Sequence, residues 1–231
     1  MATILGITAA QLANDYPAIV TSGLIINLDA ANINSYTGTG TKWYDLTNNN
    51  NDVTLVSSPI YNSGGYFTFN GTTQYAISDS TSLLGGTGNI AHSVEMWVNF
   101  SVIDNIYRWW LSEIGPYTTG SHHWIGTSGT STQFGVYAGG QTSPILSGIN
   151  NWQHIVSTHD GTNYKVYVNS ILKGTTSATF GFTSSQWNIG KPQGAEGYFN
   201  GKISIGRIYN RAITDVEVTQ NYNALKSRYG L

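Results

Sequence analysis

The chain has 231 residues, of which 13% are aromatic and only 10% are charged, with a formal net charge of −2 and no cysteine. This composition excludes disulfides and thiolate metal sites, argues against disorder, and provides no basic surface for nucleic acid. No apolar run approaches the ~20 residues of a membrane span, and the N-terminus lacks a basic signal-peptide region. We therefore expect neither a membrane partner nor export by a signal peptide.

The N-terminal segment, residues 1–22, precedes the first predicted strand and carries more apolar side chains than a free tail needs. We interpret it as an arm that docks on a partner, against the alternative of a loosely attached tail. Docking would have to bury enough apolar surface to offset the backbone entropy lost on ordering. The apolar side chains available for this assembly are Ile4, Leu5, Ile7, Leu12, Ile19 and Val20.

From residue 23 onward, short runs rich in β-branched and aromatic residues alternate with loops rich in Gly, Asn and Ser. Strands at a spacing of about 8–12 residues are typical of a sandwich or jelly roll. The sequence therefore predicts one all-β domain over residues 23–231. The predicted strands lie within residues 23–29, 52–56, 65–71, 74–78, 91–101, 106–115, 122–128, 132–138, 152–160, 163–170, 171–176, 186–191 and 198–210.

The clearest strand pair is the hairpin of residues 152–170. An Asp-Gly pair, which is a strong hairpin turn signal, separates its two runs of β-branched and aromatic residues. In the second strand, alternation places Tyr164, Val166 and Val168 on one face, which we expect to face a core. The other face is left for water or for a second layer.

One helix is predicted, at the end of the chain. Thr214 and Glu217 have the spacing of a capping box, in which each side chain bonds the backbone N–H of the other residue. Gly230 lies past the helix as a stop signal. The apolar stripe of the helix comprises Val218, Tyr222 and Leu225.

Six motifs resemble the laminin G-like, concanavalin A-type jelly-roll domains, and they occur in the order found in that family. They are LDAANINSY (28–36), WYDLTNNNND (43–52), FTFNGTTQY (67–75), VEMWV (94–98), the hairpin from Trp152 to Asn169 and the closing segment from Phe199 to Ala224. The resemblance implies an antiparallel, concanavalin A-like jelly-roll β-sandwich with a short N-terminal arm and a C-terminal helix. Ser170 departs from the family, which usually has Gly there, so we expect a strained or different turn. Asn48 and Asn50 also replace usual glycines in the loop after Trp43.

The closing segment resembles versions found in structural proteins of tailed bacteriophages. This resemblance implies a non-enzymatic virion protein on the particle surface, such as a head decoration or fibre component, made in the host cytoplasm. Its expected partners are other virion proteins such as the major capsid protein, and we expect a homo-oligomer such as a trimer. The alternative is a lectin-like module that binds cell-surface glycans, and such binding would also aid adhesion of a particle. A glycoside hydrolase is the least favoured class.

Catalytic residues are not expected. A glycosidase needs two carboxylates at one cleft, about 5–5.5 Å apart for retention or about 6.5–9.5 Å apart for inversion. A related hydrolase pattern places acids at nearby positions of one strand, but here Glu95 is followed by Trp97 and Asn99. His154 and His159 fall on opposite faces of their strand, so they cannot share a metal. We interpret Glu95 as a structural carboxylate bonded to neighbouring backbone or hydroxyl groups.

A calcium site is one hypothesis for the loop after Trp43. The resembled family often holds Ca²⁺ near the rim of the sandwich, and this ion prefers oxygen ligands. The candidate ligands are Asp45, Asn49, Asn51 and Asp52. The alternative is that these side chains bond their own backbone in turns. We expect no required cofactor and, where calcium binds, a purely structural role.

Glycan binding would need exposed aromatic rings with polar groups around them. The candidates lie in one loop-rich region and are Trp109, Trp110, Tyr117, His123 and Trp124. The alternative is that these rings belong to the core or to a protein–protein contact, where tryptophan is also enriched.

Overall fold

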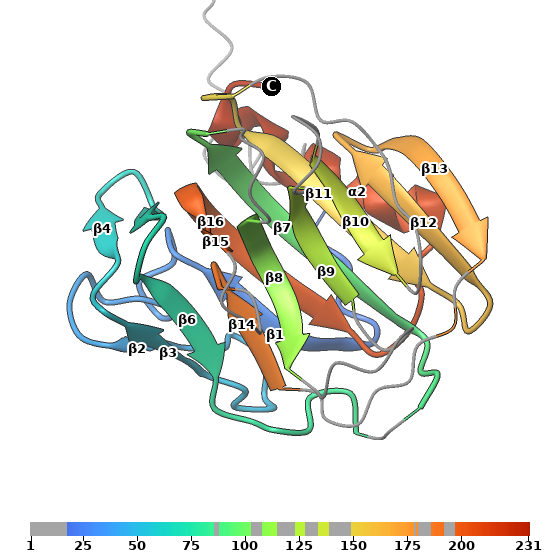
Figure 1. The fold of residues 1–231 in the computed structure, drawn as a ribbon, viewed down its shortest axis with the longest axis horizontal. Helices are drawn as coiled ribbons and strands as arrows, with labels where there is room; N and C mark the ends of the chain where they lie inside the picture. Colours follow the sequence, from blue (N-terminus) through green and yellow to red (C-terminus); the bar gives the residue numbers. More distant parts are fainter. Residues whose placement is uncertain are drawn as a thin grey trace, which may run out of the picture.

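The computed structural model describes residues 18–85, 88–102, 108–114, 123–127, 134–138, 149–177, 179, 186–191 and 197–231. In residues 108–114, 123–127 and 134–138 the description covers the backbone alone. Most of the described chain is strand, and the strands form two sheets that lie one behind the other in Figure 1. The predicted jelly-roll β-sandwich is therefore confirmed. In the described part of the chain, no helix has the length and apolar character needed to cross a membrane.

The first sheet, which we call sheet A, has the strand order β13-β12-β11-β7-β16-β5-β4, and β1 also pairs with β16. All of these pairings are antiparallel. The strands of sheet A are β1 (Leu24–Asp29), β4 (Ile60–Asn62), β5 (Tyr66–Asn70), β7 (His92–Phe100), β11 (Gln153–His159), β12 (Asn163–Val168), β13 (Ile171–Ser177) and β16 (Asn200–Tyr209).

The second sheet, sheet B, has the order β10-β9-β8-β14-β6-β3-β2, and the short β15 adds to β8 as a parallel partner. The strands of sheet B are β2 (Lys42–Trp43), β3 (Val53–Val56), β6 (Tyr75–Ser78), β8 (Arg108–Ile114), β9 (His123–Thr127), β10 (Phe134–Ala138), β14 (Gln186–Ile189) and β15 (Gly197–Tyr198). Three short strands, β2, β4 and β15, were not predicted. Strand β2 lies in a stretch that reads as loop, and the predicted strand of residues 198–210 is divided between β15 on sheet B and β16 on sheet A.

The core fills the space between the sheets because alternate residues of each strand point inward. Along β7, the central strand of sheet A, Val94, Met96 and Val98 belong to this core. Ser93, Glu95 and Trp97 alternate with them and lie on the outer face of sheet A. The largest side chains of the core are Trp43, Phe67, Phe69, Phe100, Tyr164 and Trp187, all of which are buried.

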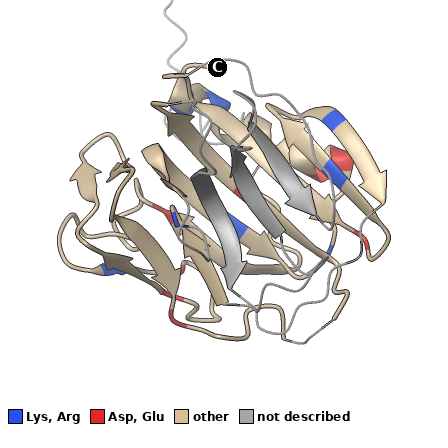
Figure 2. Ribbon diagram, in the orientation of Figure 1, with Lys and Arg blue, Asp and Glu red and all other residues tan. Residues whose placement is uncertain are grey.

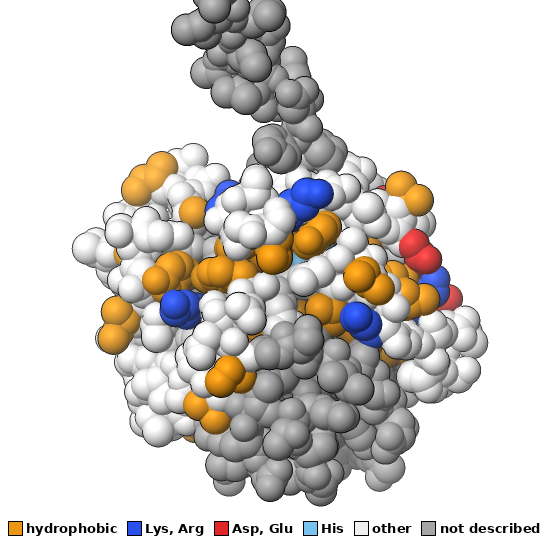
Figure 3. Space-filling view, turned by 90° about the horizontal axis from the view of Figure 1, so that it is seen from above, with side chains coloured by type: hydrophobic (Ala, Val, Ile, Leu, Met, Phe, Trp, Pro, Cys, Tyr) orange, Lys and Arg blue, Asp and Glu red, His pale blue; other side chains and the backbone are white. Residues whose placement is uncertain are grey.

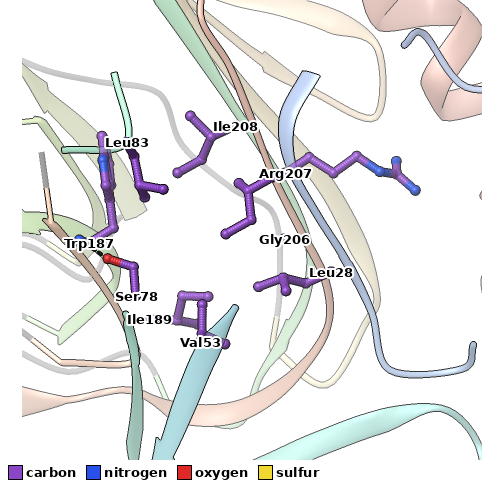
Figure 4. Close-up of a pocket in the computed structure, with 10 residues that line it drawn as sticks. Leu28, Val53, Ser78, Leu83, Trp187, Ile189, Gly206, Arg207 and Ile208 are labelled. Atoms are coloured by element: carbon purple, nitrogen blue, oxygen red, sulfur yellow. Dashed lines mark hydrogen bonds between the residues drawn. The ribbon is translucent and has the colours of Figure 1, made fainter. Parts of the chain in front are cut away.

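A small cavity lies within this core and is lined mainly by apolar side chains, among them Leu28, Leu83 and Ile208 (Figure 4). Its volume of about 10 Å³ is at the lower limit for one water molecule. The side chain of Arg207 runs away from the cavity, although the residue contributes to its wall. The cavity is therefore a packing void and is too small for a sugar.

The C-terminal helix α2 (Asp215–Leu225) covers the outer face of sheet A, behind the sheets in Figure 1. Both hydrogen bonds of the predicted capping box between Thr214 and Glu217 are present. A 3-10 helix, η1 (Lys226–Tyr229), continues it, and Gly230 ends it at a φ of 74°. The second layer expected on the hairpin is this helix. A separate apolar cluster joins the helix to sheet A and comprises Val20, Val156, Tyr167, Tyr209, Ile213 and Val218.

Residues 18–22 pack against the chain's own helix. Val20 is buried, and its backbone N–H donates to Asn221 Oδ1 at 2.8 Å. Gln220 Nε2 donates to the carbonyl of Ala18 at 2.6 Å. Val20, which we assigned to a partner interface, is therefore occupied within the domain. Ile4, Leu5, Ile7 and Leu12 lie outside the described residues.

Candidate functional site

Glu95 is a polar group with four side-chain partners, and it is fully buried on β7 beneath α2. Its Oε1 accepts from Arg207 Nη1 at 2.6 Å and lies 3.1 Å from His154 Nε2. Its Oε2 accepts from Asn221 Nδ2 at 2.6 Å and lies 3.2 Å from the hydroxyl of Tyr209. Four groups from β16, β11 and α2 thus converge on one carboxylate.

The neighbours of Glu95 stabilise its negative charge. Burial opposes ionisation, but the Arg207 guanidinium and His154 outweigh it and lower the pKa of Glu95 to about 2. The partners of Glu95 are a guanidinium, an imidazole, an amide and one hydroxyl, so the backbone and hydroxyl partners that we predicted were only partly right. The carboxylate is inaccessible to solvent and faces no second carboxylate among the described residues, which favours a structural role.

The two histidines of β11 lie on opposite faces, as predicted. His154 lies beside Glu95, whereas the ring of His159 lies 5.6 Å from that of His92. In the described chain, no group of three or more His, Asp or Glu side chains is placed to hold a metal ion.

In the loop proposed for calcium, the candidate side chains form hydrogen bonds with backbone groups. Asp45 Oδ1 accepts from the N–H groups of Asn27 and Thr47, and its Oδ2 accepts from the N–H of Asn51 at 3.0 Å. Asp52 Oδ1 accepts from the N–H of Asp45 at 2.9 Å. Asn49 and Asn51 turn their amide nitrogens toward the carbonyl of Ile25. These contacts match the alternative in which the side chains stabilise turns, and calcium binding here stays a prediction.

The predicted glycan-binding residues fall where the structure describes little. Tyr117 lies outside the described residues. Trp109 and Trp110 lie on β8, and His123 and Trp124 on β9, where only the backbone is described. Register places Trp109 opposite Tyr198 of β15, whose ring is 6.2 Å from that of Tyr75.

A second aromatic surface, which sequence reasoning missed, lies on the outer face of sheet A beside η1. The half-buried ring of Trp152 lies 5.6 Å from that of Tyr66 and 4.9 Å from that of Tyr229. Tyr229 in turn stacks on buried Trp97 at 4.0 Å. We call Tyr66, Trp152 and Tyr229 the aromatic patch. Figure 3 looks onto this end of the molecule, where hydrophobic side chains form a broken band with basic side chains beside it.

Polar groups border the aromatic patch. In the sheet register, Asn99 is opposite Lys202, and Lys202 is opposite Thr68. Trp152 directly precedes Gln153, the partner of Val98, so the continuing register places Trp152 beside Asn99. Asn99 is only 5% exposed, and its Oδ1 has no hydrogen-bond partner in the described structure. A buried amide oxygen without a hydrogen-bond partner is energetically costly.

Comparison with known proteins assigns the family. The family model described as the concanavalin A-like lectin/glucanases superfamily matches residues 69–219, which is more than half of the chain. The chain belongs to this superfamily. None of the curated proteins matches the chain.

Several solved structures share the concanavalin A-like fold of this chain. A Trypanosoma rangeli sialidase in complex with 2,3-difluorosialic acid matches with a TM-score of 0.70 and 17% identity over 91% of this chain, which spans 34% of the sialidase chain. Domain 4 of an extracellular arabinanase from Geobacillus stearothermophilus, in complex with arabinotriose, matches with a TM-score of 0.61 and 20% identity over 87% of this chain and 98% of that domain. The botulinum neurotoxin serotype G binding domain matches at 0.62 and 16% identity, over 86% of this chain and 50% of that one. At these identities the likeness concerns the fold.

Proposed function

We propose that this protein is a non-catalytic carbohydrate-binding module and that the aromatic patch is its binding surface. The observation that carries the proposal is the meeting of two half-buried rings, Trp152 and Tyr66, with the unpartnered amide oxygen of Asn99. The lectin-like fold supports it, as does the arabinotriose in the complex of the similar arabinanase domain.

The chemistry of the patch suits a sugar ring. The C–H face of a pyranose is apolar and packs on an aromatic ring, while its hydroxyls need fixed polar partners. Trp152 supplies the ring, and the amide of Asn99, which is buried in the free protein, would have to turn outward to accept a hydrogen bond from a sugar hydroxyl. Binding therefore relieves a cost already present in the free protein.

The absence of catalysis is part of the proposal. The one acidic side chain suggested by the hydrolase pattern, Glu95, is buried beneath α2 and paired with Arg207. Such a group can neither reach a glycosidic bond nor exchange a proton with substrate. We expect no hydrolysis of a β-glucan panel by the purified protein.

The direct test is glycan-array binding followed by titration calorimetry with Trp152→Ala. Loss of one stacking contact is worth about 1.4 kcal/mol, so we expect affinity to fall about tenfold. Trp152→Phe keeps a ring and should retain most of the affinity. Tyr44→Ala is the matched control, because Tyr44 is an exposed aromatic residue outside the patch.

Two results would contradict the proposal. One is a folded Trp152→Ala protein, checked by circular dichroism, that binds the selected glycan as tightly as the unmodified chain. The other is an array on which the unmodified protein binds no glycan.

A second candidate function is the virion-surface role, supported by the resemblance of the closing segment to phage structural proteins. In that setting the module would be exposed on the particle, would bind the major capsid protein or its neighbours, and would form a homo-oligomer such as a trimer. Its arm would be residues 1–17, because residues 18–22 already pack on α2. Glycan binding at the patch would then serve adhesion.

The arm is tested by deletion. We expect a chain lacking residues 1–17 to stay folded and to elute as a monomer in size-exclusion chromatography with light scattering, whereas the full chain elutes as an oligomer. Extending the deletion through residue 22 removes buried Val20 and should also lower the melting temperature. A full chain that is monomeric, or a 1–17 deletion that still assembles, would remove this candidate.

A further inference from the structure

Lys202 is a basic group at the edge of the aromatic patch. Its Nζ lies 5.2 Å from the ring centroid of Tyr66, and its neighbours in the register are Asn99 and Thr68. Within the described residues, no carboxylate lies within ion-pair distance of this ammonium group. The ring contact therefore positions a charge without neutralising it.

Two acidic side chains linked to this part of sheet A, Asp29 and Glu95, are already paired with arginines. Asp29 accepts from Arg228 Nη1 with both carboxylate oxygens, at 2.8 and 2.9 Å. Glu95 is paired with Arg207 and buried. Neither carboxylate is free to repel an anion, so the patch offers a local positive charge beside aromatic rings.

We infer that the sugar bound by the aromatic patch carries a carboxylate, and that Lys202 receives it. This inference rests on the proposed function and adds the class of ligand: an acidic glycan, built from uronic or sialic acid. The sugar ring packs on Trp152 and a hydroxyl donates to Asn99 Oδ1. The carboxylate reaches the ammonium group of Lys202, which lies on the far side of Asn99 from Trp152 in the sheet register.

The arrangement also predicts a dependence on salt. The Lys202 ammonium is at the surface, so its attraction to a carboxylate is screened as ionic strength rises. Packing on the rings and the hydrogen bond to Asn99 are not screened in this way. Affinity for an acidic glycan should thus fall with added salt, whereas affinity for its neutral counterpart should stay constant.

The experiment compares matched pairs of probes by titration calorimetry: trigalacturonic acid with its carboxyl-reduced form, and sialyllactose with lactose. We expect at least one acidic probe to bind about five- to tenfold more tightly than its neutral counterpart. Lys202→Gln should abolish this difference, while Lys202→Arg should keep the preference. Lys173→Gln, at an exposed lysine on β13, is the matched control.

The outcomes separate this inference from the proposed function. Binding that depends on Trp152 but is equal for acidic and neutral probes would overturn the acidic ligand and leave the carbohydrate-binding function standing. A Lys202→Gln variant that retains the preference would overturn the role of Lys202 and likewise leave that function standing. No binding of any probe, together with a glycan array on which nothing binds, would overturn both.

Discussion

At the scale of single residues, Glu95 shows what a strand pattern can and cannot reveal. Alternation along β7 correctly places it on the face opposite the core, and the absence of acids at nearby positions favours a structural role, which stays a prediction. Its partners could not be predicted, because His154, Arg207 and Asn221 lie 59, 112 and 126 residues away in sequence. Only the packing of three separate elements brings them together.

The removal of the Glu95 charge should destabilise the protein strongly. Glu95→Gln leaves the Arg207 guanidinium buried without its counter-charge, and breaking such a pair costs about 3–5 kcal/mol of unfolding free energy. Asp79→Asn is the control, because its pair with Lys42 is exposed and should contribute less than about 1 kcal/mol. Urea unfolding measures both, and a Glu95→Gln variant as stable as the control would refute the structural role.

The pair of Glu95 and Arg207 also makes the unfolding free energy depend on pH. The folded-state pKa of Glu95 is about 2, below the ordinary value of 4.5. Its charge therefore contributes fully above about pH 4.5 and is progressively lost as the pH falls toward 2. The unfolding free energy of the unmodified chain should fall more steeply over this range than that of Glu95→Gln.

At the scale of elements, the periodicity of apolar residues and the turn and capping signals predicted most of the fold. Alternating apolar residues marked the hairpin of β11 and β12, and the capping box marked the start of α2. Strands β2 and β4 were missed because they are two and three residues long, and partners elsewhere in the chain hold them. The aromatic patch was missed for a related reason: Tyr66 and Trp152 belong to separate strand signals, and only the sheet register makes them neighbours.

The sequence predicted a strained or different turn between β12 and β13, and the structure places two non-glycine residues of this turn at positive φ. Asn169 and Ser170 have φ angles of 50° and 64°, in the left-handed region that disfavours side chains. Ser170→Gly should therefore raise the unfolding free energy by about 0.5–1 kcal/mol. Ser177→Gly, at an exposed end of β13 outside the turn, should lower it by a similar amount, about 0.5–1 kcal/mol. A Ser170→Gly protein that unfolds at lower urea concentration than the unmodified chain would contradict the strain.

At the scale of the whole molecule, the C-terminal helix divides the outer face of sheet A into two parts. Over β7 and β16, α2 buries Glu95 and its partners, which form a rigid interior layer. Beyond η1, the same face leaves Tyr66 and Trp152 half-buried and Lys202 beside them. Charged residues are sparse over the described chain (Figure 2), and Lys202 is one of three lysines there that lie over a tyrosine ring. We therefore propose this end of the sandwich as the binding surface.

Nuclear magnetic resonance of the full chain, during titration with the glycan selected by the array, would locate the binding surface directly. We expect the indole signal of Trp152 and the amide signals of Asn99 and Lys202 to shift with a common saturation curve, while the indole of buried Trp43 does not move. Shifts confined to Tyr75 and Tyr198 on sheet B, with Trp152 unchanged, would place the binding surface on the other sheet and refute the aromatic patch as the glycan site.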